Sequence, residues 1–389
     1  MDGKIIYLDN AATTRVCKSA ADTSISAMEN FYGNPSSVHA FGYEAQKELE
    51  KSRKTLLHAI GSSERGDDFI FTSGGTESNN LAIFGSVSAQ NKHCGNTILV
   101  GDSEHASVYN ISKRLSELGY DIKYIPSKNG KLDLDFCENV LKNEKVILMS
   151  CMYVNNETGA IFDVKSLDAL RKTFSKNTVF HVDGVQAFMK TKEKLIKTGA
   201  DLISVSGHKI HAPKGVGGLY IKSGTKISNI IYGGGQEKNI RSGTEPMPGI
   251  CAFAAAAEEY MNDSEKIHAH IEELYKYAKE KISGMMPDIA ILSPEKNSPY
   301  VMSISVPNIR SEIMLRFLSE KNIFVSAGSA CSAKHRENRV LINYGLDFKS
   351  ADSTLRISFS KYNTKEDIDS LADALYSGKN SLIKVKYFS

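Results

Sequence analysis

The sequence predicts an α/β protein, with a mainly parallel β-sheet covered by helices and a smaller α+β domain beside it. Short apolar runs alternate with amphipathic segments from about residue 61 to residue 222, as strands and crossover helices do in a parallel sheet. After about Glu258 the pattern changes to long charged helices between a few apolar runs. We therefore expect a large domain at 16–258 and a small domain formed by 1–15 and 259–389.

The large domain should begin with a long helix at 41–61, where apolar residues recur at helical spacing and Gly61 provides a stop signal. Strands are expected at the apolar runs 68–73, 97–102, 146–154, 178–183, 201–206 and 218–222. Helices fit between several of these runs, as at 164–176. Ligand sites in such sheets lie at the carboxyl ends of the strands, so polar residues at those ends are the first candidates for function.

The small domain should contain one long charged helix at 257–285. Strands are expected at 298–307 and 353–360, and further helices at 311–322 and 365–378. This order of helices and strands is typical of an α+β unit.

The bulk composition excludes several classes of protein. A length of 389 residues is enough for two domains, and 41% hydrophobic with 24% charged residues is ordinary for a soluble chain. A net charge of +3 is too small to indicate direct nucleic-acid binding. No apolar run approaches the roughly 20 residues of a membrane helix, and the first residues lack a signal-peptide pattern, so we expect a cytoplasmic protein without a membrane partner. The six cysteines are scattered without a CxxC pair and are expected to be free thiols, at positions 17, 94, 137, 151, 251 and 331.

The stretch "FIFTSGGTESNNLAIFG" at 69–85 is a strand, a glycine turn and a helix start. Free backbone N–H groups and the helix dipole at such a start bind phosphate well. Gly75 allows close approach of the backbone, and Thr76 adds a hydroxyl group. An ordinary capped helix is the alternative interpretation of this stretch alone.

Three further strand ends carry ionisable residues, each with an ordinary structural alternative. Asp183 ends an apolar strand, where it is either a functional carboxylate or a helix cap or structural ion pair. His105 follows another strand, and alone it is as easily a loop histidine. His208 and His211 have a spacing seen in metal sites, but no acidic or cysteine ligand lies nearby, so no metal is expected.

Taken together, the strand ends indicate one cofactor. They carry the glycine turn, His105, Asn156, Asp183, Gln186, Ser206, His208 and Lys209. A phosphate cradle, an acid for a pyridinium nitrogen and a lysine for a Schiff base are what pyridoxal 5'-phosphate requires. Lys209 is then the covalent anchor of the cofactor, and Asp183 keeps its ring nitrogen protonated.

At this point the sequence resembles a known family, the cysteine desulfurases of the NifS/IscS type. The matching stretches are colinear from Tyr7 to Ser360: "YLDNAATT", "GNPSSVHAFG", "FTSGGTESNN", "SEHASV", "VNNETG", "HVDGVQ", "SGHKIHAPKGVGGLY", "GGGQEKNIRSGTEP", "GSACS" and "LRISFS". The resemblance implies a fold-type I pyridoxal-phosphate-dependent transferase of the class V aminotransferase group, with a seven-stranded sheet in its large domain.

The resemblance also implies a role for each cofactor residue. Lys209 would bind the cofactor covalently, His105 would stack on its ring and help to move protons, Asp183 would pair with the ring nitrogen and Gln186 with the ring oxygen. The phosphate would be held by Gly75, Thr76, Ser206, His208 and, from the second subunit of a homodimer, Thr244.

For the substrate, L-cysteine, the resemblance implies that Arg356 binds the carboxylate, a task that suits a guanidinium group. Asn156 would contact both cofactor and substrate, and Asn34 and Arg241 would shape the same region.

Cys331 lies in the small-residue, basic stretch "VSAGSACSAKHRENRV", and a small core residue is its structural alternative. Nearby cations favour the thiolate. The resemblance makes it the nucleophile on a mobile loop: L-cysteine becomes L-alanine, and the persulfide on Cys331 passes to an acceptor protein for iron–sulfur cluster assembly or tRNA thiolation. The sequence "AKHRENR" after "GSACS" replaces the Ser-Leu-Glu-Pro-Ser type segment of longer-loop members, which leaves the acceptor open.

Two alternatives remain at this point. A class V aminotransferase or a selenocysteine lyase would have the same fold, although an aminotransferase has no need of Cys331 in a basic loop. A catalytically inactive scaffold would belong to a different class, and the full set of cofactor residues argues against it.

Overall fold

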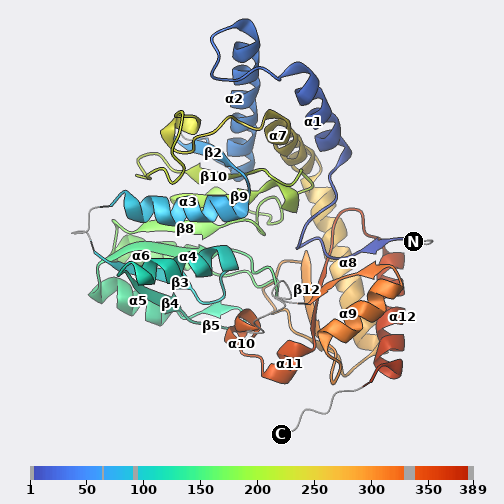
Figure 1. Cartoon of the computed structure of the whole chain (residues 1–389). Helices are drawn as coiled ribbons and strands as arrows, with labels where there is room; N and C mark the ends of the chain where they lie inside the picture. The colour runs from blue at the N-terminus through green and yellow to red at the C-terminus, as the bar shows by residue number, and fades with distance from the viewer. Residues whose placement is uncertain (1–3, 64, 91–94, 328–337, 384–389) are drawn as a thin grey trace.

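Two β-sheets organise the chain (Figure 1). The computed structural model describes residues 4–63, 65–90, 95–327 and 338–383. A seven-stranded sheet has the strand order β2-β10-β9-β8-β7-β3-β4, and a four-stranded sheet has the order β11-β12-β15-β14. No helix in these described ranges is both long enough and apolar enough to cross a membrane.

The seven-stranded sheet confirms the predicted α/β class. Its strands are β2 (Asp68–Thr72), β3 (Thr97–Gly101), β4 (Asp121–Ile125), β7 (Val146–Met152), β8 (Val179–Asp183), β9 (Leu202–Ser206) and β10 (Gly217–Ile221). All neighbouring pairs are parallel except those of β10, which runs antiparallel to both β2 and β9. The six predicted strands are present. The seventh, β4, lies at the sheet edge and has only one buried residue, so it lacks the apolar run that marks the others.

Helices cover this sheet. They are α1 (Lys18–Asn30), α2 (Ala40–Ile60), α3 (Gly75–Ser88), α4 (Ala106–Glu117), α5 (Leu134–Asn143), α6 (Val164–Phe174) and α7 (Met247–Asn262). Figure 1 shows α1, α2 and α7 at the β2 end of the sheet, with the connection between α1 and α2 at the top, while α4 and α5 lie near β3 and β4. Helix α2 matches the predicted helix at 41–61 and ends at Gly61, which has φ 97° as a left-handed C-cap.

The second sheet is antiparallel and belongs to the C-terminal part of the chain. It consists of β11 (Ala290–Ile291), β12 (Val301–Ser305), β14 (Ser326–Ala327) and β15 (Thr354–Ser358). The accompanying helices are α8 (Ser264–Met285), α9 (Ser311–Glu320), α10 (Arg339–Tyr344), α11 (Phe348–Asp352) and α12 (Lys365–Ser381). Two small ribbons complete the strands: β1 (Ile6–Tyr7) pairs in parallel with β13 (Ile323–Phe324), and β5 (Ser127–Lys128) pairs with β6 (Lys131–Leu132).

We propose the domain boundaries expected from the sequence, near residues 15 and 258. The strands of the large sheet all lie within 68–221, and those of the four-stranded sheet within 290–358. The pairing of β1 with β13 places the N-terminal segment with the C-terminal unit.

The prediction of one continuous helix at 257–285 is wrong, because the structure has two helices in this range. Helix α7 ends at Asn262 and α8 begins at Ser264, with Asp263 between them at φ −111° and ψ 14°. Asn, Asp and Ser are all weak helix formers, and three in a row make this the natural place for a break.

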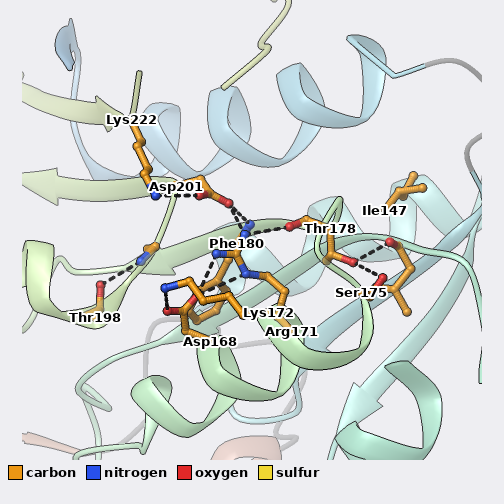
Figure 2. A network of polar contacts seen from close by, with 12 residues as sticks. Ile147, Asp168, Arg171, Lys172, Ser175, Thr178, Phe180, Thr198, Asp201 and Lys222 are labelled. Atoms are coloured by element: carbon orange, nitrogen blue, oxygen red, sulfur yellow. Dashed lines mark hydrogen bonds and ion pairs between the residues drawn. The ribbon is translucent and has the colours of Figure 1, made fainter. Parts of the chain in front are cut away.

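A buried ionic cluster lies at the amino ends of strands β8 and β9 in the large sheet (Figure 2). Arg171 on α6 donates to Thr178 O at 2.9 Å, to Asp201 Oδ2 at 2.5 Å and to Asp168 Oδ1 at 2.7 Å. Lys172 adds a contact to Asp168 Oδ2 at 2.6 Å. Thr178 and Asp201 directly precede β8 and β9, so the cluster ties α6 to the amino ends of these strands. Its pairs are satisfied internally, which indicates a structural role.

The core of the large sheet contains one histidine that should make stability depend on pH. His181 in β8 is fully buried between Ser150 Oγ and Ser204 Oγ, each at 2.9 Å from a ring nitrogen. Burial lowers the pKa of His181 to about 3, whereas the unfolded chain protonates this ring near its ordinary value of 6.5. The folded pKa is depressed, so the stabilisation is complete above pH 6.5 and is lost as the pH falls toward 3.

When the pH falls from 6.5 to 4.5, the free energy of unfolding of wild type should therefore decrease by about 2–3 kcal/mol more than that of His181→Gln. Urea unfolding at a series of pH values measures this difference. His58→Gln, at an exposed position on α2, is the matched control and should follow the wild-type pH profile. Parallel pH profiles for wild type and His181→Gln would contradict the assignment.

Candidate active site

Polar side chains from neighbouring strands meet at the carboxyl edge of the large sheet. Asp183 is the last residue of β8, Ser206 is the last residue of β9, and Lys209 closes the 3-10 turn Gly207–Lys209 that follows β9. His105 is the N-cap of α4, shortly after β3. Because β9, β8, β7 and β3 are consecutive in the sheet, their carboxyl ends lie side by side, as the sequence predicted.

Lys209 is held by the N-terminal segment of the chain. Its Nζ donates to Ala11 O at 2.7 Å and to Ala12 O at 2.6 Å. Gln186 Nε2 donates to the same Ala11 carbonyl at 2.8 Å. The predicted anchor lysine and the predicted ring-oxygen partner therefore share one acceptor.

Asp183 is a buried carboxylate with fixed partners. Its side chain accepts hydrogen bonds from Asn79 Nδ2 at 2.8 Å and from Val185 N at 3.0 Å. Asn79 also donates to Ser107 Oγ at 2.9 Å, while its own Oδ1 is buried without a hydrogen-bond partner among the described residues. The carboxylate of Asp183 is therefore held in one orientation at the end of β8.

His105 is positioned to act as a neutral imidazole. Burial lowers its pKa, the Asp183 carboxylate partly offsets this effect, and the Lys209 and Arg339 cations lower the pKa further. Its Nδ1 accepts from Ser107 N at 3.2 Å, so the neutral ring carries its proton on Nε2. Arg339 in α10 donates to the carbonyls of Asp102 and Glu104, which fixes the turn before His105.

The start of α3 and the end of β9 form a cradle that fits a phosphate group. Helix α3 begins at Gly75, and Gly74 before it has φ 149°, a conformation that favours glycine. The hydroxyl of Ser206 is buried without a partner among the described residues, and a Cβ on Gly74 would lie 3.8 Å from it. An anionic oxygen would satisfy both this hydroxyl and the free N–H groups of the helix start.

A cavity of about 620 Å³ opens beside this cradle, and its lining includes Thr76, His105 and Ser107. His208 lies on the other side of the strand end, with Nδ1 at 3.2 Å from Thr13 Oγ1. Burial, followed by the neighbouring lysines, lowers the pKa of His208 to about 4, so this ring is a neutral hydrogen-bonding group. The donors present therefore fit pyridoxal phosphate.

Arg356 reaches the same edge from β15 of the second sheet. Its Nη2 is 2.8 Å from Asp9 Oδ1, and its Nη1 donates to Asn156 O at 3.1 Å. Asn156 thus contributes its carbonyl group here, while the neighbouring Asn155 uses its side chain to shape the turn that follows.

Comparison with known proteins gives the family. The model of the class-V aminotransferases matches residues 6–371. A protein described as cysteine desulfurase IscS from Dictyoglomus turgidum is 36% identical over 376 residues, which cover 95% of this chain and 93% of the relative. The chain belongs to the cysteine desulfurases of the NifS/IscS type, within the class-V aminotransferase family.

Solved structures agree with this assignment. A structure described as a NifS-like protein superposes with a TM-score of 0.90 at 34% identity and covers 97% of this chain and 100% of its own. A structure described as SspA in complex with cysteine superposes with a TM-score of 0.78 at 26% identity and covers 92% of this chain and 99% of its own. These superpositions confirm the predicted fold of this cysteine desulfurase.

Two predicted residues are not brought to the site by this single chain, and a third lies outside the described residues. Asn34 lies exposed in the connection between α1 and α2, where its side chain accepts from Ser36 N. Thr244 is exposed in the segment after Arg241. Cys331 lies outside the described residues. All three roles remain predictions.

Several residues of this cysteine desulfurase's site were missed by sequence reasoning. Asn79 lies within the helix start and carries no strand-end signal, although its motif was singled out. Asp9 and the Ala11 carbonyl come from a segment interpreted only through its resemblance.

Arg241, expected to shape the site, pairs with Glu77 at 2.8 Å and so fixes its own segment to the first turn of α3.

Proposed function

We propose that this chain binds pyridoxal 5'-phosphate and converts L-cysteine to L-alanine, with the sulfur transferred to Cys331. One observation carries the proposal: Lys209, the buried Asp183 carboxylate and the Ser206 hydroxyl, which has no hydrogen-bond partner within the described part of the chain, meet at the carboxyl ends of neighbouring strands. A lysine, an acid and a phosphate cradle are the groups that this cofactor requires.

The cofactor, when bound, supplies an electron sink for a carbanion at the α-carbon of an amino acid. Asp183 would hold the proton on the ring nitrogen, and Gln186 would donate to the ring oxygen. The amine of Lys209 takes the proton from the α-carbon once it is released from the Ala11 and Ala12 carbonyls. His105, neutral with its proton on Nε2, would be suited to holding or returning a proton during the reaction. Arg356 binds the substrate carboxylate.

The sulfur step needs a thiolate, and three of the described cysteines are poor candidates. Burial raises the pKa of Cys137 to about 12 and that of Cys251 to about 11. Burial also raises the pKa of Cys151 well above its ordinary value. In the proposed step the Cys331 thiolate bonds to the substrate sulfur, the substrate Cβ–S bond breaks with its electron pair on Cβ, and Cβ takes up a proton. The products are alanine and a persulfide on Cys331.

We further propose a homodimer with a second copy of this chain on the α1–α2 face. Tyr32 and Val38 in the connection between α1 and α2 are 69% and 105% exposed, and Phe41 and Tyr43 at the start of α2 are also exposed. An apolar group of this kind is typical of an interface. Thr244 is exposed as well, as a residue that completes the partner's phosphate site would be.

The persulfide would then pass to an acceptor protein in the cytoplasm, for iron–sulfur cluster assembly or tRNA thiolation. The relative described as IscS supports such a sulfur-supplying role. The basic residues after Cys331 would suit an acidic acceptor surface.

The direct test is to add L-cysteine to the purified, cofactor-loaded protein and to measure alanine together with sulfide. Equal amounts of the two products in the presence of a thiol reductant support the desulfurase. Alanine without sulfide, or a requirement for an added keto acid, would instead indicate an aminotransferase.

Asp183→Asn should lower turnover at least about tenfold, because a charge-assisted hydrogen bond contributes roughly 1.5–3 kcal/mol. The substitution keeps the size of the side chain while it removes the negative charge that keeps the ring nitrogen protonated. Its single amide oxygen can accept from Asn79 or from Val185, but not from both. Steady-state alanine production measures the effect, and the visible absorbance verifies that cofactor is bound. Asp163→Asn, at the exposed N-cap of α6, is the control. Wild-type activity in Asp183→Asn would make this carboxylate structural.

A further inference from the structure

Asp9 forms an ion pair with Arg356 at the place where the substrate carboxylate is expected. The Arg356 side chain is 7% exposed and that of Asp9 is 21% exposed. The backbone holds Asp9 in place, because it forms a parallel bridge with Ser358 and its carbonyl accepts from the Tyr7 hydroxyl at 3.2 Å. The carboxylate of Asp9 is therefore a fixed part of the site.

The donors of Arg356 are only partly used. A guanidinium has five N–H groups. Nη2 pairs with Asp9 at 2.8 Å and Nη1 donates to Asn156 O at 3.1 Å, whereas Nε is buried without a hydrogen-bond partner among the described residues. A buried donor of this kind is costly until an acceptor arrives. Asp9 and Asn156 thus take two of the five N–H donors and fix the plane of the guanidinium, so that within the described residues further donors remain for a ligand.

Other basic groups lie near Arg356. Burial, followed by the Lys209 and Arg356 cations, lowers the pKa of Lys190 to about 7. Within the described residues the contacts of Lys190 are Gln186 Oε1 at 3.4 Å and the ring of Tyr300 at 5.7 Å, and neither is a carboxylate. Without Asp9, three basic groups would attract any ligand that carries two negative charges.

We propose that Asp9 is a specificity and positioning residue: it orients Arg356 toward one substrate carboxylate and its charge disfavours amino acids that carry a second acidic group. The inference rests on the proposed function, because it takes Arg356 as the carboxylate site. It assigns to Asp9 the selection of a substrate with an uncharged side chain, such as the thiol of cysteine, over a dicarboxylic amino acid.

Asp9→Asn separates charge from geometry, because the amide oxygen still accepts from Arg356 Nη2. Propionate and succinate are suitable probes, since they carry one and two carboxylates and have no amine to react with the cofactor. Calorimetry on the cofactor-loaded protein should show that Asp9→Asn raises the ratio of succinate to propionate affinity at least about tenfold, as the loss of one nearby charge requires.

Asp9→Ala removes the hydrogen bond as well as the charge. It should raise the KM for L-cysteine about tenfold or more while it changes kcat less, because Arg356 loses its orientation but the groups at the α-carbon remain. Asp22→Asn is the matched control, since Asp22 is exposed and pairs with Lys18 on α1. Asp22→Asn changes the net charge by the same amount as Asp9→Asn. It should leave the succinate-to-propionate affinity ratio, and the KM and kcat for L-cysteine, at their wild-type values.

An unchanged succinate-to-propionate ratio in Asp9→Asn would overturn the inference, provided that wild type converts L-cysteine. Failure of wild type to convert L-cysteine would contradict the proposed function instead, so the two failures are distinguishable. Competition by L-aspartate against L-cysteine gives a second measurement: it should strengthen in Asp9→Asn and stay weak in wild type and Asp22→Asn.

Discussion

Lys209→Ala should abolish alanine formation, with a loss of at least about a thousandfold, because it removes the group that moves the α-proton as well as the covalent anchor. The variant should still bind pyridoxal phosphate through the cradle at Gly75 and Ser206. Borohydride reduction followed by mass spectrometry should find pyridoxyl on Lys209 in wild type and at no lysine in the variant. Alanine production and cofactor content measured together separate loss of chemistry from loss of binding.

Lys214→Ala is the matched control, because Lys214 is exposed and only five residues further along the chain. It should keep both activity and the reducible link. Pyridoxyl found on Lys214 or Lys190 in wild type would contradict the assignment of the anchor.

Cys331→Ala should keep the cofactor and its yellow colour but form no protein persulfide and almost no alanine. The physical reason is that Lys209, Asp183 and Arg356 are unchanged, while the nucleophile that removes sulfur from the substrate is absent. Radiolabelled L-cysteine, followed by peptide mapping of the bound label, measures the sulfur directly.

Cys137→Ala and Cys251→Ala are the controls for this experiment. Both thiols are buried with raised pKa values, so neither should hold label in wild type. Label on Cys94 or Cys151, or alanine produced at the wild-type rate by Cys331→Ala, would favour an aminotransferase or a lyase over a desulfurase.

The sequence predicted which candidate residues lie together at the strand ends. Asp183, Ser206 and Lys209 follow apolar runs, and the topology of a parallel sheet brings such positions together. The break in the helix at Asp263 was missed because only three poor helix formers mark it. The edge strand β4 was missed because its residues are mostly half-exposed and form no apolar run.

Contacts between distant segments could not be predicted in the same way. The pair of Arg356 with Asp9 joins residues 347 positions apart, and the bonds from Lys209 to the carbonyls of Ala11 and Ala12 join residues 198 and 197 positions apart. A backbone carbonyl has no residue signature, so no pattern of side chains marks it as the acceptor of the anchor lysine. Such contacts follow from the tertiary packing of the N-terminal segment.

That packing has a consequence for how the protein is made. The segment around Asp9–Ala12 contacts Lys209 from one side and Arg356 and Ser358 from the other, while β1 pairs with β13. During synthesis this segment therefore meets Lys209 once the large sheet has been made, but it meets β13, Arg356 and Ser358 only after the second sheet has been translated. Contacts of such long sequence separation form slowly. A nascent or C-terminally truncated chain should fold its large sheet first and acquire a complete site only once β13 and β15 have been made.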